Sequence, residues 1–408
     1  MTNKINSVFF ATFSIRSNNE RTSTNGMIEP IESFFVPKLK RFMLLEQPHP
    51  GSDTVIPILE NYKNGKLKKK SHFFLTSYLL LPLLKLSNLN KTQIIFKVRD
   101  FLSIFELILR NRQKYDLFIG LESINALAGI ILRRLKVVNR VVYYVSDYSP
   151  NRYKVAWFNK LYLSLDRFAA INCDFIWDVS KAMMPARIKA GLDPKKTALL
   201  IHVPNALYKK QIKYLPVSKI IPNSLVYVGT LGKINGPDIA IRALTEVLKT
   251  LPNVTLHIYG YGEPDISRIK NLSNKLKLTG KVVFHGFISD QVELSKQTSQ
   301  YAIALAPYLE TPGSPRWWAD ATKIRLYLAA GLPVITTKVP PLGRDVEQDG
   351  AAIITGDNPK EFAKTITSLL KNKIIYNAMK KNAIKRAKGN TWENTYSSAI
   401  SKMSIDLS

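Results

Sequence analysis

The amino-acid sequence predicts an α/β protein of two successive domains, each with a parallel sheet covered by helices on both faces. The chain has 408 residues, which is more than a single hydrophobic core usually serves. Short apolar strand patterns alternate with helical patterns in both halves, as in sheets whose parallel strands are joined by helices. Between the halves, proline and lysine interrupt the pattern at Pro204–Pro222. We therefore expect one domain over residues 1–205 and a second over residues 206–389.

The first half contains several short apolar runs that are typical of buried strands. These runs are Ser7–Ser14, Thr54–Leu59, Gln93–Lys97, Leu117–Gly120, Arg140–Val145 and Phe175–Val179. Helical patterns lie at Ile124–Leu135 and Trp157–Ala170, and a polar, turn-rich loop is expected at residues 16–26.

The second half repeats this alternation with clearer boundaries. Strands are expected at Ser224–Gly229, Val254–Gly260, Lys281–His285, Tyr301–Ala306 and Pro333–Thr337. Helices are expected at Pro237–Lys249, Asp265–Lys277, Asp290–Thr298 and Ala321–Ala330. Domains of this kind bind ligands beyond the carboxyl ends of their strands. The sequence thus predicts two Rossmann-like domains facing across a ligand-binding cleft.

Composition restricts the kinds of site that the chain can hold. The 59 Lys and Arg residues against 30 Asp and Glu give a net charge of +29, which attracts nucleic acid, anionic lipid or phosphorylated small molecules. The single cysteine, Cys173, excludes an internal disulfide and agrees with a reducing cytosol. The five histidines stand far apart in the sequence, so no metal site is expected. The longest apolar stretch, Phe73–Leu84, is too short to span a bilayer, and no signal peptide is evident.

A glycine-containing loop in the second half is the first candidate for ligand binding. Gly229, Gly232 and Gly236 follow a buried strand, and a helix begins after Pro237. Glycines let the backbone approach a diphosphate, which free amides and a helix N-terminus stabilise. Lys233 would add a positive charge. The alternative is a tight strand-to-helix turn without a ligand.

The start of a later helix is the second candidate. Asp320, Thr322 and Lys323 precede the apolar run that ends at Gly331. A helix N-terminus binds phosphate well, and Thr322 and Lys323 would strengthen that binding. The alternative is a helix that Asp320 merely caps.

Together these segments resemble the GT-B glycosyltransferases, most nearly the family-4 and family-1 types. The resemblance covers roughly residues 115–400 and depends on the order and spacing of its motifs rather than on any one of them. The motifs are Val142–Pro150, Asp174–Lys181, Val203–Leu207, Gly229–Ala243, Ile258–Gly262, His285–Ile288, Leu305–Tyr308, Lys323–Thr337 and Thr391–Ser398. The resemblance implies that a C-terminal helix, at residues 390–408, returns to the first domain.

The sequence departs from the family pattern at two places. Family-4 enzymes usually carry an Arg and a Lys facing the diphosphate, where this chain has Thr230 and Asn235. Their paired glutamates would fall at Trp318 and Leu326, neither of which is acidic. The usual ribose-binding carboxylate is therefore missing, and Asp320 is the possible replacement.

The resemblance implies transfer of a sugar from a nucleotide-diphosphate sugar to a hydroxyl group, as a hexosyltransferase that retains or inverts configuration. The diphosphate would lie on the backbone and side chains of Gly229, Thr230, Gly232, Lys233, Thr322 and Lys323. The base would lie between Tyr259, Gly260 and Gly262 on one side and Phe287 on the other. Asp147 would act at the reacting centre, either as the base that accepts the acceptor's proton or as a group that orients the sugar or acceptor. No further cofactor is implied.

A basic segment suggests where the acceptor comes from. Residues 63–114 contain 12 basic and two acidic residues, and the run Lys66–Lys70 precedes the apolar stretch Phe73–Leu84. Such a pattern favours an interfacial helix on an anionic membrane, although a core helix beside a solvated lysine loop is the alternative. We expect a peripheral protein on the cytoplasmic face of the cell membrane, acting on a lipid-linked or glycan acceptor in polysaccharide or cell-envelope synthesis. The competing function is a catalytically inactive protein that retains the fold and binds polyanions or nucleic acid. For the preferred function a nucleic-acid partner is not expected, because the charge is diffuse.

Overall fold

In the computed structural model, which describes residues 3–18, 20–21, 26–85 and 89–407, the chain divides into two compact units. One unit comprises Met1–Pro204 with Tyr396–Ser408, and the other comprises Asn205–Thr395. Part of the loop expected at residues 16–26 and residues 86–88 of the basic segment lie outside the described residues. Among the described residues, no helix combines the length and apolar character needed to cross a bilayer.

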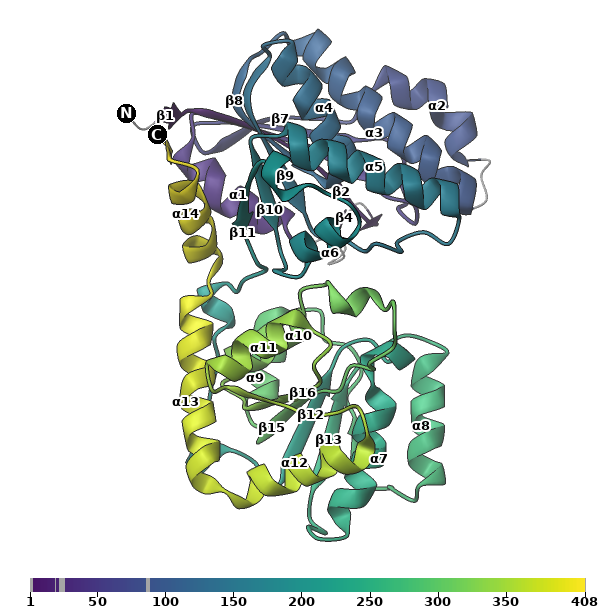
Figure 1. Cartoon of the computed structure of the whole chain (residues 1–408), viewed down its shortest axis with the longest axis vertical. Coiled ribbons are helices and arrows are strands. Elements are labelled where there is room, and N and C mark those ends of the chain that lie inside the picture. Colours follow the sequence, from purple (N-terminus) through teal and green to yellow (C-terminus); the bar gives the residue numbers. More distant parts are fainter. Residues whose placement is uncertain (1–2, 19, 22–25, 86–88, 408) are drawn as a thin grey trace. The chain divides into compact units, whose positions relative to one another are not determined.

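The N-terminal unit contains an eight-stranded sheet with the order β11-β10-β9-β8-β2-β5-β6-β7. Strands β11 to β5 run parallel to one another, and β6 and β7 add antiparallel strands at one edge (Figure 1). The strands are β2 (Ser7–Ser14), β5 (Arg41–Pro48), β6 (Ile58–Lys63), β7 (Lys66–Ser71), β8 (Tyr115–Leu121), β9 (Val138–Val145), β10 (Phe175–Asp178) and β11 (Leu199–His202). A short hairpin, β3 (Arg16–Ser17) and β4 (Glu20–Arg21), follows β2.

Helices cover this sheet, and the end of the chain returns to it. The helices are α1 (Ile28–Phe35), α2 (Leu75–Lys85), α3 (Leu89–Asn111), α4 (Glu122–Arg134), α5 (Ala156–Asn172), α6 (Met183–Lys189) and α14 (Trp392–Lys402). On α14, the Tyr396 ring lies 5.3 Å from Phe34 of α1 and 6.0 Å from Trp177 of β10, measured between centroids. The helix predicted at 390–408 is shorter, because the chain ends in strand β18 (Ile405–Leu407), which pairs with β1 (Asn3–Ile5).

The C-terminal unit contains a six-stranded parallel sheet with the order β14-β13-β12-β15-β16-β17. Its strands are β12 (Ser224–Val228), β13 (Thr255–Tyr259), β14 (Val282–Phe284), β15 (Ile303–Ala306), β16 (Val334–Thr336) and β17 (Ala352–Ile354). Its helices are α7 (Pro237–Leu248), α8 (Asp265–Lys275), α9 (Gln291–Thr298), α10 (Thr322–Ala329), α11 (Pro341–Gln348), α12 (Pro359–Lys371) and α13 (Lys373–Gly389). Strand β12 lies between β13, which follows it in the chain, and β15. The direction in which successive strands are added therefore reverses between β12 and β15.

Alternating residues of β12 build the two cores of this unit. Val226 and Val228 pack with side chains of α9, α10 and α11, whereas Leu225 and Tyr227 pack with those of α7, α8 and α12. Successive side chains of a strand point to opposite faces, so a strand that is apolar throughout needs helices on both sides, as Figure 1 shows.

In the first half, one strand prediction is wrong and one strand was not predicted. Gln93–Lys97 lies inside α3, because a short apolar run of β-branched residues also occurs in buried helices. The second parallel strand, β5, was not expected, since its sequence ends in the polar pair Glu46 and Gln47, which the structure buries completely.

Gly236 is required where the glycine-containing loop meets the sheet. Its φ is +71°, and a Cβ atom there would lie 1.5 Å from the carbonyl oxygen of Pro307. Gly280 has a similar φ of +76° but open space around it. Alanine at either position strains the backbone. Only alanine at Gly236 would also push the loop away from Pro307.

We expect Gly280→Ala to lower the free energy of unfolding by about 1 kcal/mol, the cost of a left-handed conformation. Gly236→Ala should cost at least about 2 kcal/mol more, because overpacking adds to that strain. Urea unfolding followed by circular dichroism measures both. Equal losses for the two variants would show that the loop does not need its close approach to Pro307.

Candidate functional site

The reversal in strand order creates a site at the carboxyl ends of β12 and β15. In open parallel sheets this is where ligands bind, because the chains leaving the two strands diverge. Gly229 follows β12, and Pro307 and Tyr308 follow β15. Helix α10 presents Lys323 to this place: a Cβ atom on Gly229 would lie 3.4 Å from the Lys323 Cε atom.

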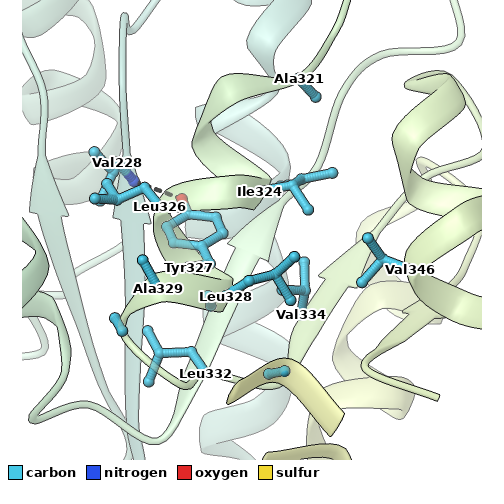
Figure 2. Packing of buried hydrophobic residues seen from close by; sticks show 14 of the residues in the cluster. Val228, Ala321, Ile324, Leu326, Tyr327, Leu328, Ala329, Leu332, Val334 and Val346 are labelled. Carbon is cyan, nitrogen blue, oxygen red and sulfur yellow. Dashed lines mark hydrogen bonds between the residues drawn. The ribbon is translucent and has the colours of Figure 1, made fainter. Parts of the chain in front are cut away.

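A buried tyrosine holds α10 against both strands. The Tyr327 hydroxyl accepts a hydrogen bond from the Val228 N–H at 2.8 Å, drawn in Figure 2, and donates one to the Leu305 carbonyl at 3.0 Å. Tyr327 is fully buried, as are its neighbours Ile324 and Ala329. The first turn of α10, with Lys323, is therefore fixed relative to the ends of β12 and β15.

Two tyrosine rings surround the Lys323 ammonium group. Its Nζ atom lies 4.4 Å from the Tyr227 ring centroid and 4.6 Å from that of Tyr308. It also lies 3.3 Å from the Tyr227 hydroxyl oxygen. Aromatic faces attract a cation but do not neutralise it, so the charge of Lys323 remains available to a ligand.

A second cation, Arg316, lies close to Lys323. Burial, followed by the positive charge of Arg316, lowers the pKa of Lys323 to about 7. Within the described part of the chain, neither Lys323 nor Arg316 has an ion pair with a carboxylate, and the buried Arg316 Nε atom has no hydrogen-bond partner. Two neighbouring cations without an anion, beside a helix N-terminus and a glycine, are suited to bind a doubly charged anion.

The glycine-containing loop is ordered by its own hydrogen bonds. The Asn235 amide donates to the Thr230 hydroxyl at 2.6 Å, and the Tyr227 hydroxyl donates to the Thr230 carbonyl at 2.8 Å. Thr230 and Lys233 are exposed, and Gly232 is half-buried. The positions of Thr230 and Asn235, where the family has cations, are thus linked to each other, while Thr322 is exposed on the first turn of α10.

The residues expected around a nucleotide base have different environments. Tyr259 is buried, and its hydroxyl lies 2.9 Å from that of Tyr301. Phe287 is 54% exposed, and its ring centroid lies 4.6 Å from that of the exposed Tyr261. Tyr259 is therefore a core residue, whereas Tyr261 and Phe287 present an aromatic pair to solvent.

The two glycines beside Tyr261 also differ in environment: Gly260 is closely packed and Gly262 is open to solvent. A Cβ atom on Gly260 would lie 2.9 Å from the Gly229 carbonyl oxygen, whereas Gly262 has open space and a φ of +107°. Gly260 thus lets the β13 loop lie against the glycine-containing loop. Gly262 lets the chain turn after Tyr261.

Asp320 has its hydrogen-bonding capacity filled within the protein. Its carboxylate pairs with Arg325 at 2.9 Å, both side chains being less than 5% exposed. One of its oxygens also accepts the Asn205 N–H at 3.0 Å. This arrangement stabilises the entry into α10, so we do not retain Asp320 as the replacement for the ribose-binding carboxylate.

In the N-terminal unit, Asp147 lies just beyond the carboxyl end of β9. Its side chain is 50% exposed and pairs with Arg152 at 3.2 Å. The buried Glu122, which follows β8, accepts hydrogen bonds from the Ser146 N–H at 3.2 Å and hydroxyl at 2.6 Å. Glu122 thereby fixes the residue before Asp147.

Two of the five histidines, which are distant in the sequence, lie in contact in the structure. The His257 Nδ1 and His285 Nε2 atoms are 3.0 Å apart, because β13 and β14 are neighbours. Burial, together with the charge of His285, lowers the pKa of His257 to about 4. Within the described ranges no group of three potential ligands gathers around a metal position.

Sequence reasoning missed Arg316, Tyr227 and Glu122. Arg316 belongs to a short 3-10 helix, Pro315–Trp317, inside an irregular segment without periodicity. Tyr227 and Glu122 lie in or beside apolar strands, where a polar residue is a usable signal, since buried polar groups need partners.

The low pKa of Lys323 is testable by nuclear magnetic resonance of the protein with ¹³C-methylated lysines. One lysine signal should titrate near pH 7 rather than near 10.5, and Arg316→Gln should move it upward by removing a neighbouring cation. Arg344→Gln, an exposed arginine on α11, is the matched control. If every lysine titrates near its ordinary value, the cation pair does not exist.

Comparison with known proteins agrees with this architecture. Residues 218–386 match the family model "Glycosyl transferases group 1", whereas no curated protein sequence gives a match. Sucrose-phosphate synthase from Thermosynechococcus elongatus is similar in structure, with a TM-score of 0.69 and 14% identity over 97% of this chain and 98% of that one.

Two further solved structures are similar and hold ligands. HepE from Anabaena in complex with UDP has a TM-score of 0.66 and 14% identity over 98% of this chain and 100% of that one. The pneumococcal O-GlcNAc transferase GtfA in complex with UDP and GlcNAc has a TM-score of 0.55 and 15% identity over 96% of this chain and 70% of that one. The chain therefore has the GT-B fold, and its residues 218–386 match a glycosyl transferase group 1 domain.

Proposed function

We propose that this glycosyltransferase moves a sugar from a UDP-sugar to a hydroxyl of a membrane-associated glycan or lipid-linked acceptor. The single observation that supports it is the Lys323–Arg316 pair, which has no carboxylate partner among the described residues and lies where the strand order reverses. A nucleotide diphosphate supplies the missing negative charge. UDP is the favoured nucleotide because HepE and GtfA were solved with it.

In the proposed complex, each part of the donor meets a chemically suitable group. The diphosphate lies on Gly229, Gly232 and the N-terminus of α10, with Lys323, Arg316 and the exposed Lys233 supplying charge. The exposed Tyr261 and Phe287 rings flank the base, since aromatic faces stack well on bases.

The reaction breaks the bond between the sugar's anomeric carbon and the diphosphate oxygen. The acceptor oxygen forms the new bond, its proton passes to the Asp147 carboxylate or to an oxygen of the leaving diphosphate, and the departing UDP develops added negative charge. Fixed cations and the α10 N-terminus stabilise that charge as it develops. Asp147 holds the acceptor hydroxyl or the sugar, a role that its ion pair with Arg152 favours because the carboxylate is already oriented.

The membrane part of the proposal is supported by apolar side chains that face solvent. On α2, Leu75, Leu79 and Leu83 recur every four residues and are 55%, 71% and 50% exposed. On α3, which packs against α2, another such row includes Val98 and Leu109. Rows of exposed apolar side chains on neighbouring helices indicate an interaction site.

Basic residues precede this apolar surface in the chain. Lysines 66, 68, 69 and 70 lie on the edge strand β7, which ends just before α2 begins, and all are exposed. Edge-strand lysines also prevent sheets from pairing, so the lysines alone do not imply a membrane. Together with the exposed leucines, they fit the anionic surface of the cytoplasmic face of the cell membrane.

Lys323→Ala should abolish glycosyl transfer, or reduce it at least about 100-fold, as expected when a fixed charge on the departing group is lost. UDP affinity should fall in parallel, while the unfolding midpoint changes little, because the ammonium has no carboxylate partner in the described part of the chain. Release of UDP from UDP-sugars measures turnover. Lys275→Ala, an exposed lysine at the end of α8, is the control. Full turnover in Lys323→Ala would refute the diphosphate assignment.

Membrane binding can be tested by sedimentation with vesicles of phosphatidylcholine and phosphatidylglycerol. Leu79→Gln with Leu83→Gln should reduce the bound fraction at least about tenfold, since each buried leucine contributes about 1.5 kcal/mol or more. Ile374→Gln on α13, where the side chain is 84% exposed, is the control. Unchanged vesicle binding of the double variant would show that these leucines do not contact the membrane.

A further inference from the structure

A second set of basic side chains without carboxylate partners among the described residues lies in the N-terminal unit, at the carboxyl ends of β2 and β5. Phe13 lies near the end of β2, and His49 directly follows β5, its N–H donating to the Ser14 carbonyl at 2.7 Å. The Phe13 and His49 ring centroids are 5.0 Å apart. Lys97, from α3, places its Nζ atom 5.7 Å from the Phe13 centroid. Side chains from β2, from the residue after β5 and from α3 thus meet at the carboxyl ends of these two strands.

The basic groups at this edge exceed the acidic ones. His49 and Lys97 are half-buried, and their side chains have no hydrogen bond or ion pair among the residues that the structure describes. The carboxylate that acts on His49, Asp100, already pairs with Arg99. Arg152, which also acts on His49, already pairs with Asp147.

The pKa of His49 is lowered by burial and by this surplus of positive charge. Burial, then the charge of Lys97, and more weakly those of Arg99 and Arg152, lower the pKa of His49 to about 4, against the opposing effect of Asp100. At neutral pH the imidazole is therefore uncharged and still has one N–H to donate. An incoming anion would meet the lysine charge, a histidine donor and a positive local field.

We propose that Lys97 and His49 bind a phosphate group of the acceptor. This inference rests on the proposed glycosyl transfer and names the chemistry of its acceptor. A phosphate monoester or diphosphate fits better than a carboxylate, because the surplus charge and the two separate donors match a multiply charged group with several acceptor oxygens. Arg152 connects this place to Asp147, so the phosphate would lie on the same edge of the sheet as the residue that holds the acceptor hydroxyl.

The test observes the histidine rings of the full chain by nuclear magnetic resonance, with the His49 signal assigned from His49→Gln. Inorganic phosphate should raise the pKa of His49 by at least about one unit, because an anion stabilises imidazolium. Lys97→Gln should remove most of the phosphate-induced change. Lys160→Gln, an exposed lysine on α5, should leave that change intact.

Measurements of UDP affinity distinguish the proposed phosphate site from the proposed donor site. Lys97→Gln should bind UDP as the wild type does, whereas Lys323→Gln should lose UDP but keep the His49 response to phosphate. No response of His49 to phosphate, or an equal response in Lys97→Gln, overturns the phosphate site and leaves the donor site standing. Loss of UDP binding in Lys97→Gln also counts against the proposal, since the variant would then act through the fold.

Two further arms identify the source of the phosphate. Glucose 6-phosphate represents a soluble phosphorylated acceptor, and phosphatidylcholine vesicles containing phosphatidic acid represent a lipid-borne phosphate. A His49 response to one alone assigns that source, and a response to both assigns a site that accepts either. If inorganic phosphate acts but neither of these does, the site holds only an adventitious ion and the proposal fails.

Discussion

The site in the C-terminal unit depends on a positive charge that the protein holds in place without neutralising. Burying an ammonium group beside a guanidinium raises the free energy of the unliganded protein, and here that cost appears as the lowered pKa of Lys323. Packing fixes the arrangement, because Tyr327 joins α10 to β12 and β15 and leaves Lys323 little freedom to move away. An anionic ligand would remove the repulsion. The packing that holds α10 against the sheet would thus also set the affinity of the site for an anion.

The same logic extends to the N-terminal unit, where the supporting residues are acidic as well as basic. Glu122 fixes Ser146, and Arg152 pairs with Asp147, so the carboxylate that we propose for the reacting centre is already oriented. Among the residues that the structure describes, His49 and Lys97 have no anionic partner at the carboxyl ends of β2 and β5. Each unit therefore combines oriented side chains with uncompensated positive charge at the carboxyl ends of its strands. In the proposed reaction such charge would bind phosphate-bearing substrates, and part of the net charge of +29 would then have a specific role.

Much of the fold could be predicted from periodicity, because buried parallel strands are apolar throughout and the connecting helices are amphipathic. The prediction failed where burial did not follow polarity: β5 ends in buried Glu46 and Gln47, and the apolar run Gln93–Lys97 belongs to a long helix. In the site, Gly229 and Lys323 were foreseeable because both lie at strand or helix ends. Arg316 was not, since an irregular segment carries it, and the internal role of Asp320 depends on Arg325 and Asn205 folding around it.

Proton uptake on UDP binding tests whether the diphosphate binds beside Lys323. With a pKa of about 7, most Lys323 side chains are neutral at pH 8 in the free protein, and a bound diphosphate would restore the charged form. Calorimetric titration with UDP at pH 8, in buffers of different ionisation enthalpy, should therefore show uptake of close to one proton, which disappears in Lys323→Ala or at pH 6. UDP binding that takes up no proton at pH 8, or the same uptake in Lys323→Ala, would contradict the account.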